Sequence, residues 1–329
     1  MRILITGGLG FIGSHTCIAL IQAGYHPIVI DNLRNTRLTV KKAIEEITGK
    51  PLEFYELNVK DTEAITTQIG TIEGIIHFAA LKSITESIDN PMGYYSENIE
   101  SLLSAIEIAK VKKVKSFIFS SSATVYGKTN EICVSEKTPI GEPLNPYAHT
   151  KILGEKILNS GSWDFKTIIL RYFNPIGAHD SRKIGELPIG EPNNLIPFIT
   201  QTASGKRKQL TVYGDNYNTK DGTCIRDFIH VMDLAESHVA ALEYSQKMNE
   251  AIDVFNVGTG KGNTVLEVIE AFEKVNNLKL NYSVGERRPG DIEAIYTDTS
   301  KIESKLGWKA QKELLTSMKD SWEWEKSLS

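Results

Sequence analysis

Residues 2–17 read Arg-Ile-Leu-Ile-Thr-Gly-Gly-Leu-Gly-Phe-Ile-Gly-Ser-His-Thr-Cys, and this stretch decides the fold. The apolar run Arg2–Thr6 predicts a strand, and Phe11–Ala23 has the pattern of a helix. Between them, Gly8, Gly10 and Gly13 satisfy G-x-G-x-x-G, and Gly7 with the last two satisfies G-x-x-G-x-x-G. Glycines between a strand and a helix permit a tight turn and bring helix N–H groups against a pyrophosphate. The stretch therefore predicts a dinucleotide-binding loop.

The rest of the first half repeats this alternation of strands and helices. Further strands are predicted at Pro27–Ile30, Leu52–Leu57, Gly74–Phe78, Ser116–Ser120 and Lys166–Leu170, with helices at Val40–Thr48 and Tyr94–Ala109. Strands that are apolar almost throughout are typical of a parallel sheet buried on both faces. The predicted fold class is α/β, with a doubly wound parallel sheet of the Rossmann type.

The sequence changes in character after Phe173. Proline and asparagine crowd residues 174–194, which predicts a loop. A helix near Leu195–Ser204, strands near Leu210–Val212 and Val254–Val257, and a closing helix near Leu314–Lys326 follow. We expect a nucleotide-binding domain over residues 1–173. Residues 174–329 should form mainly a smaller α/β substrate-binding domain, from which 226–248 can pack back on the first.

Composition and charge exclude several classes of protein. The formal charge is −4, and the longest basic block is residues 206–208, so nucleic acid is not the expected partner. Three widely spaced cysteines, Cys17, Cys133 and Cys224, fit neither a disulfide framework nor a metal site. The first residues read as a strand and a turn, with no apolar stretch of the length that a signal peptide or membrane span needs. We expect a cytoplasmic protein without a metal.

Asp31 closes the second strand, where an acid should bind the ribose hydroxyls of a dinucleotide. Its carboxylate would repel a 2′-phosphate, which favours NAD over NADP. Arg34 and Arg37 lie close enough in sequence to weaken that preference. The alternative is a plain aspartate in a turn at the end of a strand.

A serine, a tyrosine and a lysine form the candidate catalytic group. Ser122 ends the fifth strand, and Tyr147 and Lys151 lie four residues apart, so they share one face of a helix that Pro146 begins. A lysine ammonium and an oxidised nicotinamide both favour a phenolate, which suits Tyr147 to general base catalysis. Ser122 can bond the reacting hydroxyl. Singly, Tyr-x-x-x-Lys occurs by chance and a serine run can be a loop; the combination on a Rossmann domain is what points to catalysis.

With these motifs the chain resembles the extended short-chain dehydrogenase/reductase family, and within it the NAD-dependent nucleotide-sugar epimerases. The resemblance covers essentially the whole length, through residues 7–17, 31–33, 77–82, 120–127, 147–151, 171–175, 192–195, 212–214, 226–231 and 287–291. It implies reversible 4-epimerisation of a UDP-hexose through a 4-keto intermediate, with Tyr147 as base and NAD retained. It also implies a homodimer formed through the helices at Tyr94–Ala109 and after Tyr147.

The resemblance implies two sets of binding residues. The cofactor set is Gly7, Gly10, Phe11, Ile12, Gly13, Asp31, Asn32, Asn35, Asn58, Val59, Phe78, Ala79, Ala80, Lys82, Asn98, Ser120, Tyr147, Lys151, Tyr172 and Phe173. The substrate set is Lys82, Ser122, Thr124, Tyr147, Asn174, Asn194, Leu195, Thr211, Val212, Tyr213, Arg226, Arg288, Asp291 and Ile295. Without the resemblance, Arg226-Asp227 reads as a structural ion pair and Arg287-Arg288 as a solvated turn.

Several positions depart from the family's usual residues, among them Glu97 and Ser101. Asn58 stands where many members have Asp, and Ala80 replaces a common Gly. Ile295 stands at a pocket wall that is often Tyr in hexose-only members and smaller in those that accept N-acetyl sugars. Its intermediate volume leaves open whether UDP-GlcNAc and UDP-GalNAc are also substrates.

Several rival functions belong to the same scaffold. Sugar-nucleotide 4,6-dehydratases place an Asp-Glu pair where this chain has Ala123 and Thr124, and decarboxylating members place Glu at the second position. Neither residue here can supply that chemistry, so both functions are disfavoured. A catalytically silent NAD-binding regulator would be expected to lack Tyr147 or Lys151, which are present. A dehydrogenase that releases its cofactor is not separated by the sequence, and a requirement for added NAD would reveal it.

Overall fold

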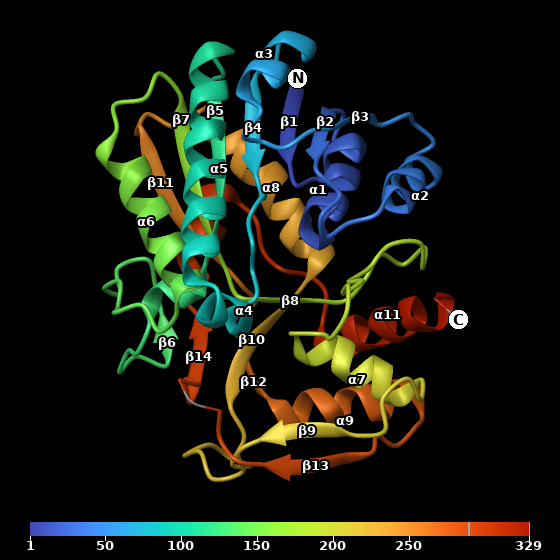
Figure 1. Ribbon diagram of the computed structural model, residues 1–329. Helices are drawn as coiled ribbons and strands as arrows, with labels where there is room; N and C mark the ends of the chain where they lie inside the picture. The colour runs from blue at the N-terminus through green and yellow to red at the C-terminus, as the bar shows by residue number, and fades with distance from the viewer. Residues whose placement is uncertain (289, 329) are drawn as a thin grey trace.

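A computed structural model describes residues 1–288 and 290–328 and is built around a seven-stranded parallel sheet (Figure 1). The strand order is β11 (Ile252–Val257), β7 (Lys166–Tyr172), β5 (Ser116–Ser122), β4 (Gly74–His77), β1 (Arg2–Thr6), β2 (His26–Asp31) and β3 (Glu53–Glu56). The six strands predicted in the first half all lie in this sheet. The predicted α/β class with a doubly wound parallel sheet is confirmed.

Alternate residues of each strand point to opposite faces of this sheet, and helices cover both faces. Ile3 and Ile5 pack with α1 (Phe11–Gln22), α2 (Leu38–Thr48), α8 (Val231–Ser245) and α10 (Ser300–Leu306). Leu4 packs on the other face with α3 (Thr62–Gln68), α5 (Pro91–Val111) and α6 (Pro146–Ser160), while the short α4 (Ile84–Asp89) contacts α5 and α6. The strands are buried on both sides, which explains their continuous apolar sequences.

The chain returns to the first sheet late in the sequence. The strand expected near Val254–Val257 was assigned to the second part, but it is β11 and pairs with β7 as the seventh strand of the first sheet. Helix α8 also packs against α1, as the prediction for residues 226–248 allows. Strand β11 lies outside that segment, and its pairing with β7 is the part of the return that the sequence does not indicate.

The remaining elements form the smaller part, drawn below the first sheet in Figure 1. One sheet has the order β12 (Gly262–Thr264), β10 (Ile225–His230), β14 (Ala294–Thr297) and β6 (Cys133–Val134), and β8 (Asn174–Ile176) also pairs with β10. A two-stranded sheet joins β9 (Leu210–Tyr213) to β13 (Tyr282–Gly285). Helices α7 (Leu195–Ala203), α9 (Val265–Asn276) and α11 (Leu314–Ser327) enclose its core. The predicted loop at 174–194 thus begins with a short strand.

Candidate active site

The glycine loop has the geometry that a bound pyrophosphate requires. Gly7 has a φ of +68°, which favours glycine, and a Cβ at Gly13 would lie 2.6 Å from the carbonyl oxygen of Gly7. Gly10 is the N-cap of α1 and supplies no side-chain cap to the helix. The first N–H groups of α1 are therefore available to an anion, with the helix dipole favouring negative charge.

Asp31 holds this loop in place. Its carboxylate accepts hydrogen bonds from the backbone N–H of Leu9 at 3.1 Å, from that of Leu33 at 3.0 Å and from the hydroxyl of Thr36 at 2.7 Å. The residue is 6% exposed and still lines the cleft described next. The sequence predicted its position at the end of β2 but not these contacts, which join residues up to 22 positions apart.

A cleft of about 690 Å³ runs along the carboxyl end of the sheet. Most of the predicted cofactor set lines it: Gly7, Gly10, Phe11, Ile12, Gly13, Asp31, Asn32, Asn35, Asn58, Val59, Phe78, Ala79, Ala80, Lys82, Ser120, Tyr147, Lys151 and Tyr172. The cleft is large, and its wall combines glycine backbone, apolar side chains and polar groups. A dinucleotide suits this lining.

Two members of the cofactor set lie behind that wall. Asn98 is buried, accepts a hydrogen bond from the N–H of Leu81 at 2.7 Å and donates to the hydroxyl of Thr150 at 3.0 Å. Phe173 is buried in an apolar cluster that includes Val125 and Ile295. Asn98 therefore supports the segment that carries Ala80 and Lys82 instead of lining the cleft.

Tyr147, Lys151 and Ser122 are brought together where β5 ends and α6 begins. Asn145 caps α6 by accepting a hydrogen bond from the N–H of Ala148 at 2.8 Å. The ammonium of Lys151 donates to the carbonyl oxygen of Ser120 at 2.7 Å and lies 5.7 Å from the centroid of the Tyr147 ring. Ser122 caps η1 (Ala123–Tyr126) by accepting from the N–H of Thr124 at 3.2 Å.

Burial decides the pKa of both titratable groups at this point. It raises the pKa of the Tyr147 phenol, and a hydrogen bond with Ser122 opposes that rise. Burial also lowers the pKa of Lys151 to about 8, against the charge of Glu155. The sequence predicts that Lys151 and an oxidised nicotinamide together bring the phenol toward a useful pKa. In the structure Lys151 does not offset the desolvation of Tyr147, so further positive charge is needed to favour the phenolate.

A second group of predicted residues meets in the smaller part. Arg226 and Arg288 both face the carboxylate of Asp291, at 3.8 Å and 3.1 Å respectively, and the Arg288 guanidinium lies 4.9 Å from the centroid of the Tyr213 ring. Asp227 instead accepts hydrogen bonds from Thr259 and Gly260. The alternative of an Arg226-Asp227 ion pair is therefore wrong, because successive residues of β10 point in opposite directions.

The other predicted substrate residues are more scattered. Lys82, Tyr147 and Asn194 line the cleft. The buried hydroxyl of Thr124 has no hydrogen-bond partner in the structure. Asn174 and Thr211 are exposed, Leu195 begins α7, and the side chain of Val212 is buried in the core of the smaller part. Pro289, in the predicted 287–291 motif, lies outside the described residues.

Glu186 is a residue of the cleft that the sequence did not indicate. Its side chain is largely buried and accepts hydrogen bonds from Lys82 at 3.1 Å and from Asn194 at 2.6 Å. It therefore links one residue of the cofactor set to one of the substrate set. Nothing in the local sequence marks it, because its partners are 104 and 8 positions away.

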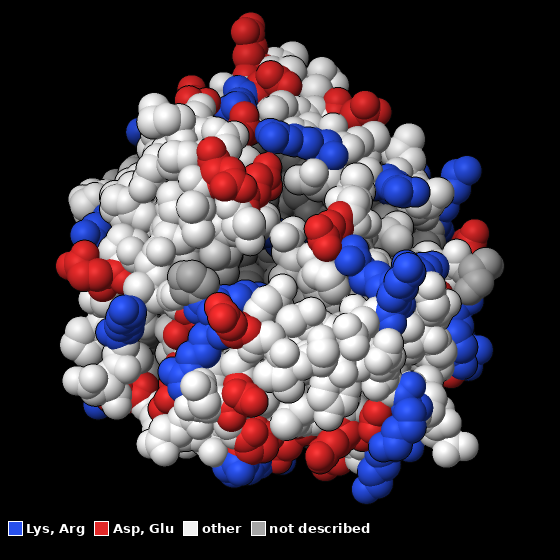
Figure 2. Space-filling model, turned by 60° about the horizontal axis from the view of Figure 1, so that its bottom comes forward, with Lys and Arg blue, Asp and Glu red and all other residues white. Residues whose placement is uncertain are grey.

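Charged residues of both signs lie around the hollow of the face shown in Figure 2 and form no single basic field. Among the described residues, no group of three or more His, Cys, Asp or Glu side chains could hold a metal ion. Within the same ranges, no helix has both the length and the apolar character needed to cross a membrane.

A glycine loop on a parallel sheet, with a serine, tyrosine and lysine at the carboxyl end, defines an extended short-chain dehydrogenase/reductase. The family model described as GDP-mannose 4,6 dehydratase matches residues 4–320. UDP-glucose 4-epimerase of Bacillus subtilis (strain 168) is 46% identical over 332 residues, covering 99% of this chain and 97% of the relative. The chain belongs to the UDP-glucose 4-epimerase family.

Solved structures agree with this assignment. UDP-glucose 4-epimerase from Bifidobacterium longum, solved in complex with NAD⁺ and UDP, superposes with a TM-score of 0.94 at 43% identity, covering 99% of this chain and 98% of the other. The UDP-Glc/GlcNAc 4-epimerase from Campylobacter jejuni superposes with a TM-score of 0.85 at 38% identity, covering 99% of both chains. The family resemblance that the sequence motifs indicate is confirmed.

Proposed function

We infer that this protein is an NAD-dependent UDP-hexose 4-epimerase that interconverts UDP-galactose and UDP-glucose through a 4-keto sugar. The observation that carries the inference is the meeting of Tyr147, Lys151 and Ser122 at the carboxyl end of the sheet, beside the glycine loop. Membership of the UDP-glucose 4-epimerase family, at 46% identity over nearly the full length, supports the same reaction.

The chain's residues suit NAD as the resident cofactor. The positive φ of Gly7 and the close approach at Gly13 leave the loop open for a pyrophosphate, and Asp31 lies at the wall of the same cleft. When bound, NAD supplies an acceptor for the hydride at C4 of the sugar and returns that hydride to the opposite face. The solved relative from Bifidobacterium longum contains NAD⁺.

Tyr147 is the base that removes the proton from the 4-hydroxyl and later returns it. Because burial raises the pKa of its phenol, the phenolate requires positive charge nearby, and Lys151 supplies part of it. Ser122 holds the reacting hydroxyl against the phenol and gives the proton a short path. The ordered placement of the three side chains on β5 and α6 keeps this geometry fixed.

The smaller part binds the nucleotide diphosphate. Arg226 and Arg288 present guanidinium groups that suit phosphate oxygens, and Asp291 orients both. Strand β9, which carries Thr211, Val212 and Tyr213, lies along the uracil base of the substrate. The remaining contacts with the sugar and the phosphates come from Asn174, Asn194, Leu195, Thr124 and Lys82.

The deciding experiment incubates the purified protein with UDP-galactose without added NAD and identifies the nucleotide sugars formed. We expect UDP-glucose, with NAD released when the protein is denatured. Product that forms only after NAD is added would indicate a dehydrogenase that releases its cofactor. No conversion under either condition would overturn the proposed function in favour of a silent NAD-binding protein.

Two further properties, the oligomeric state and the cellular compartment, are also proposed. Helix α5 exposes the apolar side chains of Met92 (77%), Leu103 (49%) and Val111 (58%), which supports a homodimer formed through this helix. Light scattering should give twice the chain mass of 36.6 kDa, and Leu103→Glu should give monomer.

The three cysteines, Cys17, Cys133 and Cys224, are all free thiols, which supports a reducing cytoplasm.

A further inference from the structure

A buried ion pair continues the helix face that carries Tyr147 and Lys151. Glu155 follows Lys151 by four residues, as Lys151 follows Tyr147, so the three side chains line one face of α6. Arg171 on β7 binds the Glu155 carboxylate through two hydrogen bonds, of 2.9 Å and 2.6 Å. The two side chains are only 2% and 6% exposed. Neither Glu155 nor Arg171 takes part in the proposed proton transfer.

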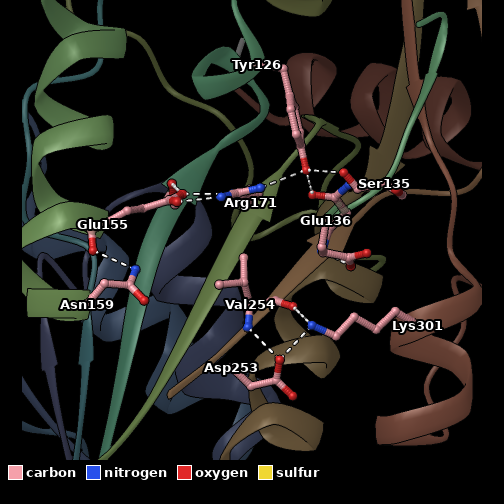
Figure 3. A network of polar contacts seen from close by, with 11 residues as sticks. Tyr126, Ser135, Glu136, Glu155, Asn159, Arg171, Asp253, Val254 and Lys301 are labelled. Atoms are coloured by element: carbon pink, nitrogen blue, oxygen red, sulfur yellow. Dashed lines mark hydrogen bonds and ion pairs between the residues drawn. The ribbon is translucent and has the colours of Figure 1, made fainter. Parts of the chain in front are cut away.

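The pair joins the elements that carry the proposed catalytic group, and Figure 3 shows its contact from Glu155 through Arg171 to Tyr126. The Ser121 hydroxyl donates to Glu155 at 2.5 Å, and Arg171 donates to the hydroxyl of Tyr126 at 3.0 Å. Tyr126 in turn donates to Asn256 of β11 at 2.6 Å. Ser121 lies between Ser120 and Ser122, Arg171 precedes Tyr172, and Tyr126 ends η1. Glu155 and Arg171 therefore set how α6 sits against β5, β7 and η1.

Stability alone does not account for such a pair. Removing two charges from water costs several kcal/mol per ion, and replacing a buried pair by well-packed apolar groups is often neutral or stabilising. Here the carboxylate lies one helical turn beyond Lys151, and it counteracts the burial that lowers the pKa of Lys151 to about 8. A negative charge at this position therefore favours the ammonium form of Lys151.

The surroundings of Lys151 identify Glu155 as the group with this effect. The titratable groups that face Lys151 are Tyr147 and Glu155 from α6 and His77 from β4. Beyond them, Arg171 of β7 binds Glu155 and Tyr126 of η1, Tyr172 of β7 interacts with Tyr147, and Glu86 of α4 bonds Tyr94 of α5. Burial keeps the pKa of His77 low, at about 3, so this histidine is neutral at pH 7. The charge of Arg171 is directed at Glu155.

We propose that Glu155, held by Arg171, is a positioning residue that keeps the Lys151 ammonium charged and fixed beneath Tyr147. This inference rests on the proposed epimerase for its consequence in turnover, but the effect on Lys151 itself does not require turnover. The pair acts through Lys151 and touches neither the reacting sugar nor the cofactor.

The primary test measures the titration of Lys151 directly. The protein is labelled with lysine carrying ¹³C at Cε, the Lys151 signal is assigned with Lys151→Met, and its shift is followed with pH. Glu155→Gln keeps the shape of the side chain and removes the charge, so the titration of Lys151 should move about one pH unit lower. Asp253→Asn is the matched control, because Asp253 pairs with Lys301 in the same region (Figure 3) and does not face Lys151.

Turnover supplies the second readout. In Glu155→Gln the alkaline limb of the kcat profile should move down by the same amount, so that kcat falls about eightfold at pH 8.5 but only about twofold at pH 7, with KM for UDP-galactose nearly unchanged. Glu155→Asp retains the charge and should keep the limb in place. If the single variant folds poorly, the double variant Glu155→Gln, Arg171→Met removes the unpaired cation and should still show the lowered titration.

A purely structural pair would behave differently. Glu155→Gln, the double variant and the control Asp253→Asn should then all lower the unfolding temperature, with the Lys151 titration unchanged, and this result would overturn the proposal. Absence of epimerase activity in the unaltered protein would overturn the proposed function instead. The Lys151 titration distinguishes the two failures, because it is measured without substrate.

Discussion

The Lys151 ammonium lies 5.7 Å from the centroid of the Tyr147 ring and is fixed by a 2.7 Å hydrogen bond to the carbonyl oxygen of Ser120. The carbonyl orients the lysine, and the positive charge then acts on the phenol through space. This arrangement supports the proposed roles, proton transfer for Tyr147 and supporting charge for Lys151, with further positive charge needed to offset the desolvation of the phenol.

Replacing Tyr147 by Phe should abolish most turnover while preserving UDP binding. The change removes the phenol oxygen and keeps the ring, so kcat should fall by about 10²–10⁴-fold, the usual contribution of a positioned base. Titration calorimetry with UDP should give an affinity close to that of the unaltered protein. Tyr95→Phe is the matched control, because the Tyr95 hydroxyl contacts His149 on α6 but lies outside the proposed catalytic group. Retained activity in Tyr147→Phe would refute the base assignment.

Epimerase activity should fall on the alkaline side with an apparent pKa near 8. Burial lowers the pKa of Lys151 to about 8, so the ammonium is present below this pH and lost above it. On the acid side activity should rise with pH, because the Tyr147 phenol must lose its proton and burial raises its pKa. Lys151→Arg keeps a charge at all accessible pH, so its profile should lack the alkaline limb even if kcat is lower. An unchanged limb in this variant would assign the titration to another group.

Protein stability should decrease as the pH falls below 6.5, because three histidines are buried as neutral groups. Burial lowers the pKa of His15 and His77 to about 3 and that of His238 to about 4. The Nδ1 of His238 lies 2.8 Å from the carbonyl oxygen of Leu234, which makes Nδ1 the protonated nitrogen and Nε2 the acceptor from Tyr172.

Between about pH 4 and 6.5 the unfolded chain binds protons that the folded protein does not. The free energy of unfolding should therefore fall with decreasing pH, by up to about 1.4 kcal/mol per pH unit for each histidine. Thermal unfolding between pH 7 and 5 measures this slope. His238→Gln should flatten it, because the substitution removes one of the three buried neutral histidines. Equal slopes in the variant and the unaltered protein would contradict the prediction.

The parts of the fold and site that the sequence predicted are local. The glycine loop follows β1 directly, and Tyr147 and Lys151 are one helical turn apart, so spacing alone places them. The apolar strands of the first half reveal the parallel sheet for the same reason: each is buried on both faces and is therefore apolar throughout.

What the sequence could not predict depends on contacts between distant segments. β11 joins the first sheet because it pairs with β7, 85 positions earlier, and no local pattern records that pairing. The same applies to Arg226, whose partner is Asp291 and not its neighbour Asp227. The contacts of Arg171 and Glu186 likewise depend on the register of the strands and on the path of the 177–194 loop.

Glu186→Gln should tighten the binding of UDP at low ionic strength. The Glu186 carboxylate holds Lys82 and Asn194 within the cleft and places a negative charge near the phosphates that we expect there. Glutamine can still bond Asn194 but no longer repels an anion, so the affinity should rise severalfold at low salt and the gain should disappear at high salt. Glu273→Gln removes a charge from the pair with Lys279, of which neither residue lines the cleft, and should have no such effect. Weaker binding in Glu186→Gln would mean that its ordering of Lys82 outweighs its charge.

Ile295 should control whether an acetamido group is accepted on the sugar. It is 4% exposed, packs in an apolar cluster with Val125 and Phe173, and lies beside Arg226 in the pairing of β14 with β10. Ile295→Ala removes three methyl or methylene groups, so the ratio of kcat/KM for UDP-GalNAc to that for UDP-galactose should rise about tenfold or more, and Ile295→Tyr should lower it.

The alanine variant should also lose about 2–5 kcal/mol of stability, because a buried side chain is truncated. Val134→Ala is the control for that loss, since Val134 belongs to the same apolar cluster but to no predicted binding set. Competition between the two substrates in one tube, with products separated by chromatography, measures the ratio independently of enzyme concentration. If Ile295→Ala and Val134→Ala leave the ratio equally unchanged, Ile295 is a core residue and the acetamido group is accommodated elsewhere.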